Sequence, residues 1–147
     1  MVIPTRDRPE AFARCLAAVG PQVDLVVVVA HMNPTYVTAG PHYRTDMLPY
    51  AEDPPNISRM WNLGLEHVAA VMGAHCDVGV LNDDAIVPPD WFQRVTDAMH
   101  SQHAAAGCVR RPTDHRMPGY AFILDGDRHL YADEQFRWWW GDTDLQR

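Results

Sequence analysis

Residues 24–30 read DLVVVVA, a run in which every residue after the aspartate is apolar. A continuous, β-branched apolar run is typical of a strand inside a sheet that is covered on both faces. Strands of this kind belong mostly to parallel sheets, whose neighbours are joined by crossover connections. The run therefore predicts an α/β protein, and the residues before it should supply a second strand and a helix.

The residues before this run have the pattern of a strand followed by a helix. Residues 2–5 read VIPT, which is rich in β-formers, and Pro9 suits the first turn of a helix that Asp7 could cap. The apolar residues that follow have helical spacing: Phe12, Cys15, Leu16 and Val19. A strand, a helix and a strand at this spacing predict a parallel pair with a right-handed crossover.

The residues after the run continue the alternation of predicted strands and helices. Residues 31–55 are rich in Pro, Gly, Asn and Thr and predict a loop around a weak strand near 46–51, and Asn56 or Ser58 could cap a long helix. The later predicted elements are a strand at 77–82, a helix at 88–102, and strands at 104–110 and 119–125. This order predicts a three-layer α/β/α sandwich with a mainly parallel central sheet.

Composition narrows the class of protein. The chain has 147 residues, which fits one compact domain, and its net charge of -7 argues against general nucleic-acid binding. Three widely spaced cysteines and the lack of a CxxC pattern favour a reduced, intracellular protein. No apolar run approaches the about 20 residues of a membrane span, and no signal peptide is recognised. A cytoplasmic domain without a transmembrane segment is expected.

Polar residues follow three of the predicted strands. Thr5, His31 and Asn82–Asp84 all fall at carboxyl ends, where ligands bind in sheets of this kind, so we expect them to share one rim. Asp83 and Asp84 are hard oxygen ligands suited to Mg²⁺ or Mn²⁺, and a bound cation would relieve their mutual repulsion. The alternative is that both are turn residues or caps of the next helix.

Three further patterns have both a functional and a structural interpretation. Residues 4–9, PTRDRP, could hold a nucleotide through backbone amides and arginine, or form a plain strand-to-helix loop. Asp142 or Asp144, after three tryptophans, could act as a base or cap a terminal turn. His100 and His103 share a helix face without a third ligand nearby in the sequence, which favours solvated surface over zinc.

Taken in order, these segments resemble the family-two-like glycosyltransferases of the GT-A fold. The matching segments are 2–19 (VIPTRDRPEAFARCLAAV), 56–69 (NISRMWNLGLEHVA, with Asn62 and Gly64 as the family's N-x-G), 78–95 (VGVLNDDAIVPPDWFQRV), 119–127 (GYAFILDGD) and 139–145 (WWGDTDL). The resemblance implies a GT-A-like, Rossmann-like fold in one domain, 1–147. Residues 1–84 would bind a nucleotide-sugar donor, and residues 85–147 would form a short acceptor-side half.

The resemblance also implies roles for individual residues. Asp84, at the end of the family's DXD-type motif, would ligate Mn²⁺ or Mg²⁺, Asp83 would contact the ribose or the metal, and Asp142 would be the catalytic base of an inverting transfer. Donor binding would involve Pro4, Thr5, Arg6, Asn56, Arg59, Asn82 and Asp83. The acceptor (a glycan, lipid-linked saccharide, protein or modified base) stays open.

The chain ends three residues after Asp144, where family members usually continue. A homo-oligomer or a partner subunit that completes the short C-terminus is therefore one expectation. Two other functions remain open as alternatives. One is a nucleotidyltransferase, although PTRDRP lacks the glycines of its usual first loop. The other is a truncated, non-catalytic module that binds nucleotide sugars.

Overall fold

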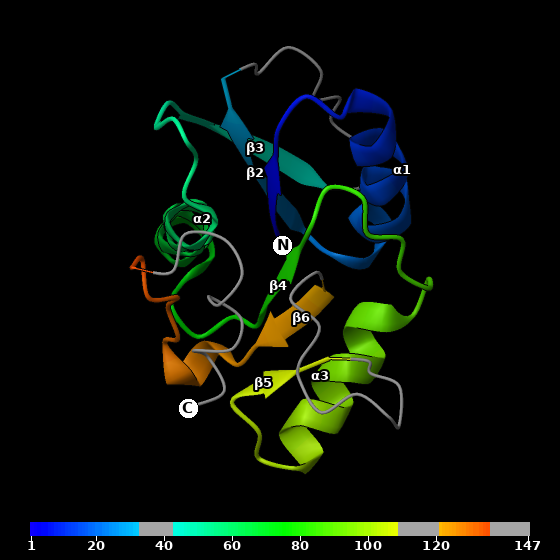
Figure 1. The fold of residues 1–147 in the computed structure, drawn as a ribbon. Helices are drawn as coiled ribbons and strands as arrows, with labels where there is room; N and C mark the ends of the chain where they lie inside the picture. Colours follow the sequence, from blue (N-terminus) through cyan, green and yellow to red (C-terminus); the bar gives the residue numbers. More distant parts are fainter. Residues whose placement is uncertain (33–42, 109–120, 136–147) are drawn as a thin grey trace, which may run out of the picture.

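A six-stranded mixed sheet forms the centre of the computed structural model, which describes residues 1–32, 43–108 and 121–135 (Figure 1). The strands are β1 (Val2–Thr5), β2 (Leu25–His31), β3 (Arg44–Tyr50), β4 (Val78–Leu81), β5 (Ala106–Gly107) and β6 (Ala121–Leu124). The helices are α1 (Pro9–Val19), α2 (Ile57–Met72) and α3 (Trp91–Ser101), with short 3-10 turns η1 (Gly20–Gln22) and η2 (Gly126–Arg128).

The strand order is β3-β2-β1-β4-β6-β5. The pairs β2–β3, β1–β2 and β1–β4 are all parallel, whereas β6 is antiparallel to both β4 and β5. The predicted, mainly parallel sheet is therefore confirmed, with β6 as the strand that reverses direction. This reversal is absent from the side-chain pattern, because an apolar strand looks the same in either direction.

Helices cover both faces of the sheet, with α1 and α3 on one side and α2 on the other (Figure 1). Successive residues of β1 and β2 alternate between the two apolar clusters. The cluster beneath α1 and α3 includes Ile3, Phe12, Val26, Val28 and Trp91, and the cluster beneath α2 includes Val2, Val27, Val29, Trp61 and Phe122. All seven residues of β2 are buried, so both faces of this strand need apolar side chains. The predicted three-layer α/β/α sandwich is confirmed.

Two local features differ from the sequence-based expectation. The N-cap of α1 is Arg8 without a side-chain cap bond, and Asp7, with a φ of 49°, is not the cap. The weak strand expected near 46–51 is the seven-residue β3, which pairs along the whole of β2. Its side chains are mostly half-buried or exposed, so its main stabilisation is the backbone ladder. Within the described residues, no helix is long and apolar enough to cross a membrane.

Helix α2 begins at a cap that the sequence indicates. Asn56 accepts a hydrogen bond from the backbone N–H of Arg59 at 3.1 Å, as an N-cap side chain does. Farther along, Gly64 is buried where the helix meets β1, and a Cβ at that position would overlap the side chain of Val2. The missing side chain of Gly64 is therefore what lets α2 approach the sheet this closely.

We expect Gly64→Ala to lower the free energy of unfolding by about 1–2 kcal/mol, because overpacking against fully buried Val2 outweighs the higher helix propensity of alanine. Urea unfolding followed by circular dichroism measures the change. Glu66→Ala, on the exposed side of the same helix, is the control and should change stability little. A Gly64→Ala protein more stable than the parent would contradict the close contact.

Candidate functional site

The carboxyl ends of the two central strands meet at a buried carboxylate. The Thr5 hydroxyl donates a hydrogen bond to Asp83 Oδ2 at 2.9 Å, and the backbone N–H of Arg6 donates to the same oxygen at 3.4 Å. Thr5 ends β1, and Asp83 follows its parallel neighbour β4, so the topology brings them together across a long stretch of sequence. The expectation that Thr5 and Asp83 share one rim is confirmed, while their roles in donor binding stay predictions.

An arginine lies between the two adjacent carboxylates. Arg8 Nη1 is 2.9 Å from Asp84 Oδ2 and 3.4 Å from Asp83 Oδ1. The side chains of Arg8 and Asp84 are 57% and 54% exposed, so this contact is a screened surface ion pair that adds at most about 1 kcal/mol. The repulsion between the aspartates is thus offset by Arg8, at a position where a cation is also expected to bind.

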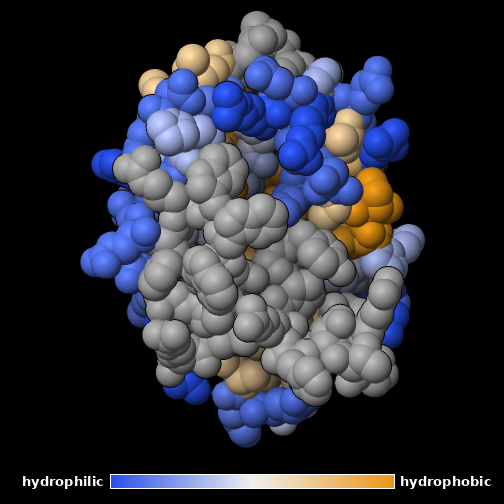
Figure 2. Space-filling view, in the orientation of Figure 1, coloured by the Kyte–Doolittle hydropathy of each residue, from blue (hydrophilic) through white to orange (hydrophobic). Residues whose placement is uncertain are grey.

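The two aspartates differ in environment. Asp83 is 6% exposed, and its burial raises the pKa of the carboxyl despite the hydrogen bond from Thr5, the charge of Arg8 and the Arg6 amide. Asp84 points outward and is available to a ligand. Figure 2 shows mainly hydrophilic residues at the top of the view, beyond the carboxyl ends of β1 and β4.

A cysteine below the pair is not a nucleophile. The Cys15 thiol donates to the carbonyl of Asn82 at 3.5 Å. Burial, followed by the charges of Asp83 and Asp84, raises the pKa of Cys15 to about 12, so the thiol stays protonated at neutral pH. The chemistry available at this rim is therefore that of carboxylates, a hydroxyl and arginine.

The rim continues along β2 and β3. His31 and Tyr50 are paired at the ends of these strands, and His31 Nε2 lies 2.9 Å from the carbonyl of Glu52. The Tyr50 hydroxyl donates to Glu52 Oε2 at 2.6 Å, and burial together with this bond raises the pKa of Tyr50 to about 12. Arg59 of α2 pairs with the same carboxylate at 3.3 Å. These contacts hold the carboxyl ends of β2 and β3 in place, on the part of the rim that does not include Asp83.

Two asparagines hold the segment at 130–135 against α2. The side-chain amide of Asn62 exchanges two bonds of 2.9 Å with the backbone of Ala132 and donates to Glu134 Oε1 at 3.1 Å. Asn56 donates to the carbonyl of Glu134 at 2.8 Å. Asn62 therefore acts as a positioning residue. The N-x-G pattern singles out this asparagine in the sequence, but it does not reveal that its partners are Ala132 and Glu134.

The predicted site residues that the structure describes are thus distributed over one edge of the sheet. Thr5, Arg6 and Asp83 are in mutual contact, and Asp84 joins them through Arg8. The others on this edge are Pro4 in β1, Asn82 after β4, and Asn56 and Arg59 at the start of α2. The candidate base Asp142, and Asp144, lie outside the described residues.

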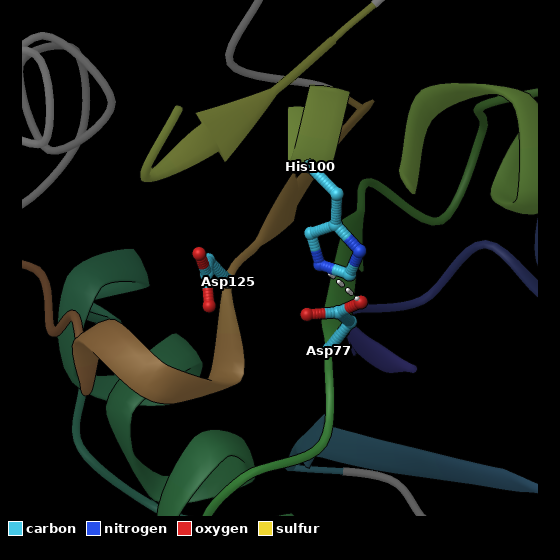
Figure 3. Close-up of side chains that lie close together, drawn as sticks. All are labelled: Asp77, His100 and Asp125. Atoms are coloured by element: carbon cyan, nitrogen blue, oxygen red, sulfur yellow. Dashed lines mark ion pairs between the residues drawn. The ribbon is translucent and has the colours of Figure 1, made fainter. Parts of the chain in front are cut away.

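A second cluster lies at the other end of β4. Asp77, His100 and Asp125 each offer one ligand atom, and these three atoms lie within 4.8 Å of one another (Figure 3). The two carboxylates beside His100 come from segments remote in sequence, just before β4 and just after β6, so the sequence alone does not reveal this grouping. The neighbouring His103 is not part of the cluster.

We expect Asp83→Asn to make the protein more stable at pH 7. The folded-state pKa of Asp83 is raised, so keeping it charged in the fold costs free energy at pH values above that pKa. The difference between variant and parent should shrink as the pH falls through the raised pKa, because Asp83 then becomes neutral. Urea titrations at several pH values measure this, and a pH-independent difference would contradict it.

We expect Asn62→Ala to release the segment at 130–135. Loss of the Asn62 amide leaves the buried N–H and C=O of Ala132 without their partners, which costs about 1–3 kcal/mol per group. Hydrogen exchange should speed up at Ala132 more than at β2, with Asn82→Ala as a control on the rim that does not contact this segment. Uniform acceleration would indicate general destabilisation instead.

Comparison with known proteins supports the fold. Neither a protein-family model nor a curated protein sequence matches this chain. Twelve chains of solved structure match it, among them S. aureus TarS 1–349, a glycosyltransferase. TarS matches with a TM-score of 0.63 at 11% identity, over 91% of this chain and 50% of the TarS chain. This chain thus spans half the length of that solved chain, and its six-stranded sheet flanked by helices has a glycosyltransferase-like, Rossmann-type fold.

Proposed function

We propose that this chain is the donor-binding and catalytic domain of a metal-dependent, inverting glycosyltransferase. The observation that carries the proposal is the contact of Thr5, Arg6 and Arg8 with Asp83 and Asp84 at the carboxyl ends of β1 and β4. In open α/β sheets, this edge is where nucleotides bind. The likeness to TarS supports a glycosyl donor over other nucleotides.

The two carboxylates divide the task of holding the donor. Asp83 is buried and oriented by Thr5 and Arg6, so it presents fixed oxygens to a ribose or to a cation beside it. Asp84 is exposed, and its oxygen faces a position already occupied by the positive charge of Arg8. The remaining proposed donor contacts are Pro4, Asn56, Arg59 and Asn82.

The donor atoms at the rim fit a hard divalent cation. Both residues offer carboxylate oxygens, and the exposed ion pair with Arg8 is weak enough to be exchanged. A Mg²⁺ or Mn²⁺ ion held by Asp84, with Asp83 beside it, would stabilise the charge of a diphosphate leaving group. Arg8, once released from Asp84, can pair with phosphate oxygens, for which the guanidinium fork is well suited.

The acceptor hydroxyl needs a base on the opposite side of the sugar. We assign this role to Asp142, which takes the proton as the acceptor oxygen attacks the anomeric carbon. Attack from the side opposite the diphosphate inverts the configuration at that carbon. Asn62 and Asn56 contribute by holding residues 130–135, the last described segment before Asp142.

Titration calorimetry with UDP-, GDP- and dTDP-sugars, with and without Mn²⁺, tests the donor site. One of these donors should bind more tightly with Mn²⁺. Asp84→Asn should remove the gain from Mn²⁺ with the fold intact, since the variant loses the exposed ligand charge. Asp97→Asn, an exposed aspartate on α3, should retain it. The absence of metal-dependent binding to every donor would refute the proposal.

Slow hydrolysis of the bound donor tests the base. Asp142→Asn should lose this hydrolysis by a factor of about 100 or more while still binding the donor, because a positioned base contributes about 10²–10⁴ to the rate. Hydrolysis undiminished in Asp142→Asn would contradict the assignment. Release of pyrophosphate from a nucleoside triphosphate would instead indicate a nucleotidyltransferase.

A further inference from the structure

The cluster of Asp77, His100 and Asp125 is built from three separate elements (Figure 3). Asp77 precedes β4 and Asp125 follows β6, and His100 lies in the last turn of α3. The antiparallel register pairs Val78 with Leu124, so the two aspartates lie opposite one another one position beyond that pair. His100 Nε2 approaches Asp77 Oδ2 at 3.1 Å.

Backbone contacts orient both carboxylates. Asp77 Oδ1 accepts a hydrogen bond from the N–H of Gly126 at 3.2 Å, and Asp125 Oδ1 accepts one from the N–H of Asp127 at 2.9 Å. Gly126 allows this arrangement, because a Cβ there would lie 2.5 Å from the carbonyl oxygen of Cys76. The close approach of these two backbone segments therefore fixes the backbone positions from which the Asp77 and Asp125 side chains extend.

The charges of the cluster are unbalanced. Like charges directly opposite on antiparallel strands destabilise the pair. Within residues 1–32, 43–108 and 121–135, the one ion pair of these two aspartates is that of Asp77 with His100, and Asp125 Oδ2 has no hydrogen-bond donor. Rim carboxylates Asp83 and Asp84, in contrast, are bridged by Arg8. A divalent cation would supply the missing charge here.

We propose that Asp77, His100 and Asp125 bind a zinc ion that clamps the end of α3 to the β4–β6 pair. One imidazole and two carboxylates are a donor set that suits Zn²⁺, whereas Mg²⁺ and Ca²⁺ take oxygen ligands. With metal–ligand distances of about 2.0–2.2 Å, neighbouring ligand atoms of a tetrahedral site lie about 3.3 Å apart. The 3.1 Å between His100 and Asp77 is close to that value, and Asp125 offers a third ligand atom within 4.8 Å of the other two. The fourth position of the tetrahedral site would be left to water.

This zinc site is separate from the proposed donor site. Asp77 lies before the first residue of β4, whereas Asp83 and Asp84 follow its last, so the two sites occupy opposite ends of the strand. Zinc here would hold α3 in place and would not contact the donor. Failure of one proposal therefore leaves the other standing.

Another histidine pair lies nearby and has to be distinguished. His75 Nδ1 is 2.8 Å from Asp127 Oδ1, and the His75 ring lies 5.8 Å from that of His129. His75 and Asp127 are 80% and 77% exposed, whereas His100 and Asp77 are 52% and 17% exposed. The partly buried, backbone-oriented cluster is the better preorganised of the two, and so we place the ion there.

Calorimetry with ZnSO₄ on the full chain, after treatment with EDTA, tests the site. One equivalent of Zn²⁺ should bind and raise the melting temperature. His100→Gln and Asp125→Asn should each weaken binding at least about tenfold, since even changes behind metal ligands cost about 10- to 100-fold. His103→Asn and His75→Gln are matched controls that should bind Zn²⁺ as the parent does. Unchanged affinity in His100→Gln, or loss in His75→Gln alone, would overturn the proposal.

The identity of the ligands has a spectroscopic check. Co²⁺ in the zinc position should show visible ligand-field bands without a thiolate charge-transfer band, because the site contains only nitrogen and oxygen donors. A thiolate band would show that Cys76 or Cys108 binds the ion and would overturn the assignment. Glu66→Ala, on the exposed side of α2 and outside both proposed metal sites, should leave the Co²⁺ spectrum unchanged.

Stability measurements with and without Zn²⁺ distinguish a metal ligand at Asp125 from a residue with only a structural role. Asp125→Asn retains the acceptor for the Asp127 N–H but removes one of two facing negative charges. The variant should therefore be more stable than the parent in EDTA and less stable than the parent in saturating Zn²⁺. A variant less stable in both conditions would refute the cation site.

Discussion

The whole arrangement depends on the position of β1 between β2 and β4. Its four residues are buried and pair in parallel with β2, and Val2 also pairs in parallel with Val80 of β4. Parallel pairing places the carboxyl ends of the three strands at one edge, so residues from distant parts of the sequence meet there. The bond between Thr5 and Asp83 is a direct consequence of that geometry.

Much of this fold can be predicted from side-chain patterns, because its central strands are covered on both faces. The valine run of β2 and the cap at Asn56 are local signals, and the structure has both. Strand β3 was harder to predict, because the ladder to β2 uses backbone groups and leaves its side chains half-exposed. The direction of β6 has no sequence signature at all.

The candidate site likewise has parts that local sequence patterns predict and parts that depend on the tertiary fold. Thr5 and Asp83 can be predicted to meet, since each directly follows or ends a strand of apolar residues. The segment PTRDRP indicates a role for arginine, but no local pattern predicts the pairing of Arg8 with Asp83 and Asp84. These partners are about half the chain away, and the pairing depends on how the loop after β1 turns back. Asp77 and Asp125 face each other only because β6 is antiparallel, and so their cluster with His100 could not be anticipated. Metal binding, the donor and the base remain predictions.

The position of β3 at one edge of the described sheet has a consequence for association between molecules. Within the described residues, one edge of this seven-residue strand has no partner strand, and such an edge is a template on which a foreign strand can add. Pro49 lacks an N–H to donate, and Arg44 and Asp46 form an ion pair of 2.7 Å on the same strand. At the opposite edge, β5 has two residues. Proline and charge on β3, and the shortness of β5, therefore make both edges poor templates for sheet extension and protect the chain against strand-mediated aggregation.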